Sequence, residues 1–110
     1  MANVFETFTS RAVGTSLTAV GSHTVAGSTT ETCIGMTVAN ILGSAVTVTV
    51  TYNDGSNDTN LVKNAPVPSG GSLVPIGGDQ KIVLTTGDSI KVSSNTASSI
   101  DATISVLQQT

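Results

Sequence analysis

The feature that most constrains the fold is an alternation of apolar and hydroxyl side chains, clearest in residues 46–52, which read VTVTVTY. Successive side chains of a β-strand point to opposite faces of the sheet. This period of two therefore places the three threonines on one face of a strand, and on the other Val46, Val48, Val50 and Tyr52. No stretch of the chain keeps a helical period over several turns, so the alternation favours an all-β protein.

Nine segments with strand character are separated by turn-forming residues at short intervals. They are residues 4–13, 16–20, 29–40, 45–52, 59–65, 72–76, 80–84, 89–94 and 99–107. In the third segment, Gly35 is predicted to mark a bulge, and one face is predicted to hold Ile34, Met36 and Val38. In the last segment, one face holds Ile100, Ala102, Ile104 and Val106.

Turn chemistry indicates how these strands are joined. Residues 53–58 read NDGSND, the strongest hairpin signal in the chain, and residues 21–30 have the composition of a long loop. Pro66 and Pro68 are predicted to bound the fifth strand, because neither can donate a hydrogen bond to a ladder. We predict a single domain over residues 1–110, an antiparallel β-sandwich of about eight or nine short strands in jelly-roll or immunoglobulin-like order.

The composition argues against several classes of function. Charged residues make up 10% of the chain and aromatic residues 3%, with a net charge of −3. Four cations far apart in sequence, without a series of aromatic rings, predict no binding of nucleic acid. No segment has the roughly 18 apolar residues of a membrane span, and we predict no membrane partner. The glycine pairs 70–71 and 77–78 precede strands rather than a phosphate-binding helix, so no small-molecule substrate is predicted.

The candidates for catalysis and metal binding are few. His23 and Cys33 are each the only residue of their type and cannot by themselves make a four-ligand zinc site. We interpret His23 as an exposed loop residue and Cys33 as a buried small side chain. The acidic run 54–58 lacks the pattern of a calcium loop. The sequence thus predicts no enzyme, no catalytic residue, no metal and no cofactor, and its one thiol favours a reducing cytoplasm.

Phe5 and Phe8 are the most distinctive residues left, because Tyr52 is predicted to lie in the core. They lie within the first ten residues, where chains are commonly frayed. We predict that residues 1–8 form an assembly arm, in which Val4, Phe5 and Phe8 contact a partner. The alternative is that the same residues are simply the first strand, packed on its own core.

Four stretches resemble the small virion structural proteins of tailed bacteriophages, including those of cyanobacteria. They are residues 8–15 (FTSRAVGT), 34–40 (IGMTVAN), 61–68 (LVKNAPVP) and 77–84 (GGDQKIVL). The resemblance covers most of the chain. It implies a β-sandwich subunit present in many copies, assembled in the cytoplasm of a bacterial host and located in the virion. It also implies partners, namely the major capsid protein or other virion structural proteins, and a homo-oligomer.

Three hypotheses about function follow. The first is a capsid cement or decoration subunit that stabilises the head, and the second is an adaptor at the neck, tail or fibre attachment. The third belongs to another class, a carbohydrate-binding or adhesin-like module. Such modules present exposed aromatic faces to sugar rings, and this chain has only Phe5 and Phe8 for that purpose.

Overall fold

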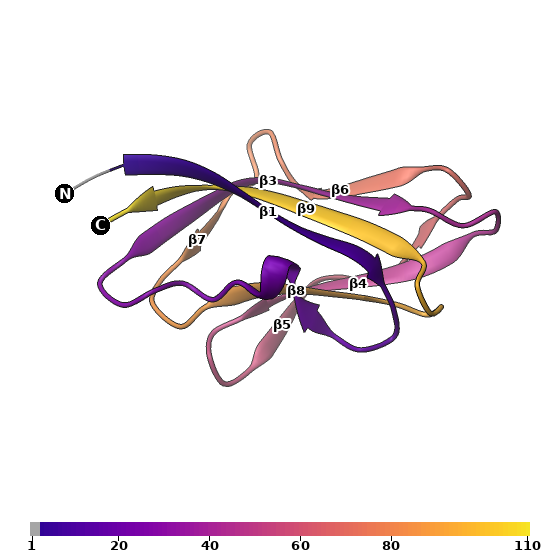
Figure 1. The fold of residues 1–110 in the computed structure, drawn as a ribbon, viewed down its shortest axis with the longest axis horizontal. Helices are drawn as coiled ribbons and strands as arrows, with labels where there is room; N and C mark the ends of the chain where they lie inside the picture. Colours follow the sequence, from indigo (N-terminus) through magenta and orange to yellow (C-terminus); the bar gives the residue numbers. More distant parts are fainter. Residues whose placement is uncertain (1–2) are drawn as a thin grey trace.

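A computed structural model describes residues 3–110, which form two antiparallel β-sheets packed face to face (Figure 1). The first sheet contains β1 (Asn3–Val13), β9 (Ile100–Gln109), β3 (Thr30–Asn40), β6 (Ser72–Ile76) and β7 (Ile82–Leu84). The second contains β2 (Thr18–Ala19), β8 (Ser89–Ser94), β4 (Val46–Asn53) and β5 (Asp58–Val67). A single 3₁₀ turn, η1 (Val20–Ser22), follows β2. The predicted all-β sandwich is confirmed.

The strand order is that of a jelly roll. The first sheet runs β1-β9-β3-β6, with β7 also paired to β3, so β6 and β7 act as one interrupted strand. The second sheet runs β2-β8-β4-β5. The first strand therefore pairs with the last, the second with the last but one, and so on inward to the β4–β5 hairpin. This nested pairing is a long hairpin folded over into two sheets, which distinguishes the jelly roll from the immunoglobulin-like alternative.

The core lies between the sheets and follows the alternation in the sequence. β9 contributes its predicted inward row to this core, and β4 contributes Val46, Val48 and Val50. Tyr52, at the end of the β4 row, is partly buried and packs against the same core. Ile90 and Val92 of β8 complete the facing layer. These β-branched side chains suit a pleated surface covered on one side.

Gly35 lies at a bulge, as predicted, but the bulge changes which side chains face inward. The register between β3 and β9 shifts between Cys33 and Gly35. Cys33 is therefore fully buried together with Met36 and Val38, whereas Ile34 is only partly buried. The prediction that Ile34 shares the face of Met36 is wrong, because the extra residue resets the alternation.

Other differences concern strand ends and one threonine. The predicted strand 16–20 is reduced to Thr18–Ala19, because the chain turns into η1. β5 continues through Pro66, which an edge strand tolerates on its open side. Thr51 is buried rather than outward-facing, and its hydroxyl donates a hydrogen bond to Asp58 at 3.2 Å. The ladder is irregular at this point, with a register shift between Val50 and Thr51.

Candidate assembly surface

The segment predicted as an arm is the edge strand of the first sheet. β1 pairs with β9 on one side, and on its other side no strand of residues 3–110 pairs with it (Figure 1). Its register with β9 is unbroken from Asn3 to Ser10 and then shifts at a bulge before Val13. At this bulge Ala12 has φ 51°, and its N–H donates to Asp101 Oδ1 at 2.9 Å. Met1 and Ala2, the start of the predicted arm, lie outside the described residues.

The three predicted contact residues do not form one patch. Val4 lies opposite Gln108 and Phe8 opposite Ile104, so both are on the side of the sheet that faces the sandwich interior. Phe5 lies opposite Leu107 and therefore points to the outer face. Phe5 is 71% exposed and Val4 46%, whereas Phe8 is partly buried. Only Phe5 presents an aromatic ring largely free of its own domain.

Phe5 ends a row of side chains that crosses the outer face of the first sheet. The row runs from β1 to β7 through positions paired in register, Phe5, Leu107, Thr32 and Val83. Val83, at the far end, is 59% exposed, and Leu107 is partly buried. We call these four residues the outer row. The sequence did not reveal it, because its members come from four strands whose pairing is set by the fold.

On the inner side, Phe8 packs against a polar cluster made of His23, Glu31 and Gln108. The rings of Phe8 and His23 stack with centroids 3.8 Å apart. His23 Nε2 lies 2.9 and 2.8 Å from the two carboxylate oxygens of Glu31, and Gln108 Nε2 donates to the same carboxylate at 2.9 Å. The side chain of Glu31 is fully buried, and that of His23 is only 15% exposed. A buried carboxylate needs such partners, because its desolvation is costly.

The interpretation of His23 as an exposed loop residue is therefore wrong, although the residue does lie in the loop that follows η1. Its imidazole is held between a phenyl ring and a carboxylate, so it anchors the loop to β1 and β3. The sequence pattern did not point to a role for Glu31. The available signal was a charged residue two positions before Cys33, in the inward phase of β3.

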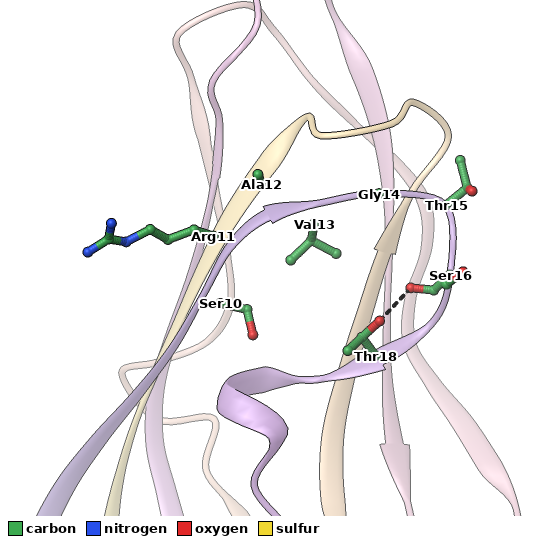
Figure 2. A pocket seen from close by; sticks show the side chains of 8 residues that line it. All are labelled: Ser10, Arg11, Ala12, Val13, Gly14, Thr15, Ser16 and Thr18. Atoms are coloured by element: carbon green, nitrogen blue, oxygen red, sulfur yellow. Dashed lines mark hydrogen bonds between the residues drawn. The ribbon is translucent and has the colours of Figure 1, made fainter.

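A shallow hollow of about 370 Å³ lies where β1 turns into β2 (Figure 2). Its lining consists of Thr18 and residues 10–16, which contribute mainly hydroxyl and small side chains. Arg11 is the one charged side chain of the lining, and in Figure 2 it points away from the loop that bounds the hollow. The Thr18 hydroxyl is engaged with the carbonyl of Ser16 at 2.8 Å. This lining brings no nucleophile together with a base.

A second buried carboxylate lies at the opposite sheet. Asp88 accepts hydrogen bonds from the Tyr52 hydroxyl at 2.5 Å and from the Thr85 backbone N–H at 2.9 Å. The bond to Asp88, followed by burial, raises the pKa of Tyr52 to about 12. Burial likewise raises the pKa of the Cys33 thiol. Within residues 3–110, each buried side-chain nitrogen or oxygen has a hydrogen-bond partner.

Across the described chain, no three His, Cys, Asp or Glu side chains gather in a way that could hold a metal ion. No helix in that part of the chain is long and apolar enough to cross a membrane. No family model, no curated protein and no solved structure matches the chain.

Proposed function

We propose that this chain is a non-enzymatic virion structural protein, a cement or decoration subunit that binds the lattice of the major capsid protein and stabilises the head. The observation that carries the proposal is the open edge of β1, where the side of Asn3–Ser10 away from β9 pairs with no other described strand and Phe5 presents an exposed ring. An edge strand can extend the sheet of a neighbouring protein, a contact that needs no pocket.

The fold and the polar groups support this role without specifying it. Jelly rolls occur in viral capsid and lectin domains, but a fold by itself does not define a function. The histidine and the two buried carboxylates, Glu31 and Asp88, are engaged in hydrogen bonds within the domain. A subunit that covers a symmetric lattice depends on surface complementarity rather than on reactive groups.

The decisive experiment is a copy count of the chain in purified phage particles by quantitative mass spectrometry. A cement subunit is expected at hundreds of copies per head, and particles lacking it should release DNA at lower temperature. A few copies per particle would instead favour the neck, tail or fibre attachment. Particles that contain none of the chain would contradict a virion role.

The contact is tested by a surface substitution that leaves the domain intact. Phe5→Ser is expected to weaken binding to heads that lack the protein, because the ring is exposed and adds little to its own fold. Val74→Ser is the matched control, since Val74 is also exposed, at 61%, but lies on β6 rather than β1. Equal binding by the two variants would remove Phe5 from the contact.

A carbohydrate-binding module is the second candidate, and the hydroxyl-lined hollow beside β1 is the observation that favours it. The lining contains no aromatic ring on which a sugar could stack. A glycan array probed with the purified chain separates the two candidates. Binding that is lost in Thr18→Ala, which removes a hydroxyl of the lining, would favour the module, and an array without hits would exclude it.

A further inference from the structure

The two sheets have four edges, and the strands at three of them carry features that oppose pairing with another chain. β2 has only two residues, and β6 and β7 are separated by a turn. β5 carries Lys63 and Pro66, a positive φ at Asn64, and two register shifts against β4. Short length, interruption, lysine, proline and bulges are the features by which natural sheets avoid edge-to-edge association.

β1 lacks these features over Asn3–Ser10. The segment contains no proline and no lysine, and it keeps an unbroken register with β9. Its one charged residue, Glu6, lies opposite Val106, on the other side of the sheet from Phe5. The bulge before Val13 limits the regular edge to these eight residues. An unprotected edge of this length favours pairing with a strand from another molecule.

We propose that β1 pairs antiparallel with β1 of a second copy of this chain, about a two-fold axis that passes beside Phe5. In this register the two Phe5 rings are directly opposed, Val4 faces Glu6 of the second copy, and Asn3 faces Thr7. The outer row then continues without a break from Val83 of one copy to Val83 of the other. Directly opposed aromatic side chains stabilise strand pairs, and the exposed ring of Phe5 acquires a partner.

The charge of Glu6 favours this register over the one in which the two-fold axis passes beside Glu6. An axis beside Glu6 would set two carboxylates opposite one another, which is destabilising. The axis beside Phe5 avoids that pairing and leaves each carboxylate opposite a valine, in solvent. A single strand pair buries less than the roughly 1,200 Å² of a standard interface, so the isolated dimer is expected to be weak. Many copies held near one another on a particle would strengthen it through a high effective concentration.

The pairing develops the assembly role proposed above by taking the neighbour at the β1 edge to be a second copy of this chain, so that Phe5→Ser would weaken binding to heads through loss of this pairing. Its test needs only the purified protein. Phe5→Cys should form an intermolecular disulfide under mild oxidation, because directly opposed Cα atoms lie about 4.5–5.5 Å apart, within disulfide range. Thr7→Cys should not, since in this register the two residues 7 are about 13 Å apart. Thr59→Cys, an exposed position on the β5 edge, reports random collision. Cys33 is present in all three variants and is buried.

A second measurement leaves Phe5 in place. Sedimentation of the natural protein up to millimolar concentration should show a monomer–dimer equilibrium, and Phe5→Lys should abolish it by opposing two positive charges. Val83→Lys, at the other end of the outer row, should retain it. The proposal is overturned if the natural protein stays monomeric, if Thr7→Cys crosslinks in preference to Phe5→Cys, or if Phe5→Cys crosslinks no more than Thr59→Cys. Such a result would not bear on the proposed location in the virion, which the copy count tests separately.

Discussion

At the scale of single residues, Glu31 depends strongly on its neighbours, because a buried carboxylate is stable only when it is hydrogen-bonded. Its carboxylate is fully buried, and its hydrogen-bond partners are His23 and Gln108. A carboxylate buried together with its hydrogen-bond partners contributes little relative to apolar residues of the same size, because desolvation offsets the attraction. Removal of one partner is far more costly, since the other is left buried without compensation.

We therefore expect His23→Ala to lower the free energy of unfolding by about 3 kcal/mol. Urea denaturation followed by circular dichroism measures this loss. The double variant with Glu31→Gln should recover most of it, because the uncompensated charge is gone. If the double variant is no more stable than His23→Ala, the cost comes from lost packing against Phe8 rather than from the carboxylate.

Tyr52 provides a second prediction, and it is the only tyrosine in the chain. Its pKa is raised from 10.0 to about 12, chiefly by the bond to Asp88. A group whose pKa is raised by folding contributes stability that is complete below its unfolded pKa and is lost as pH rises through the folded value. The contribution of this bond should thus be intact up to about pH 10 and disappear between pH 10 and about pH 12.

Phenolate absorbance measures this directly, because no other tyrosine and no tryptophan contributes. We expect a midpoint near pH 12 in the natural protein. Asp88→Asn should move the midpoint back toward the ordinary value, since it removes the acceptor charge. A natural protein that remains folded yet titrates near pH 10 would show that the bond does not persist in solution.

At the scale of elements, β1 pairs with β9 and is also contacted by the turn η1, which lies against Phe8 and Ser10. Gly21 of that turn has φ +66°, and its N–H donates to Ser10 Oγ at 2.8 Å. A Cβ added at Gly21 would lie 2.8 Å from Cβ of Phe8. The turn can therefore approach β1 only if this position is glycine.

Gly21→Ala is expected to destabilise the protein by at least about 1 kcal/mol, because the left-handed backbone and the contact with Phe8 both oppose a side chain. Relative to the natural protein, the variant should show a larger increase of backbone hydrogen exchange in β1 than in β4. Gly43→Ala is the control, since an added Cβ there meets nothing within 4 Å. Equal effects of the two substitutions would mean that η1 does not hold β1.

At the scale of the whole molecule, Cys33 reports global unfolding. It lies on β3, between β9 and β7, and is fully buried with a raised pKa. We expect a thiol reagent to modify it only as fast as the domain unfolds, so the rate should rise with urea in parallel with unfolding. Ser56→Cys, in the exposed β4–β5 turn, should react at once under the same conditions. Rapid reaction of Cys33 without urea would indicate local opening of the first sheet.

The local pattern predicted much of the fold. The alternation in residues 46–50 and 100–106 correctly assigned the inward faces of β4 and β9, and the turn at 53–58 correctly located the hairpin. Gly35 correctly marked a bulge, and Met36 and Val38 after it face inward as predicted, but before it the inward residue is Cys33 rather than Ile34. One inserted residue reverses the faces, and which neighbour absorbs it depends on packing across the sheet.

The sequence by itself determined that this chain forms antiparallel strands with a small, β-branched core, because strand periodicity is a property of adjacent residues. Only the tertiary structure decided the nested strand order, the burial of Glu31 against His23 and Gln108, and the separation of Phe5 from Phe8 onto opposite faces. These features join residues as distant as Asn3 and Gln109. Such contacts depend on how the strands pair, and pairing is set by the burial of all inward faces together rather than by any one segment.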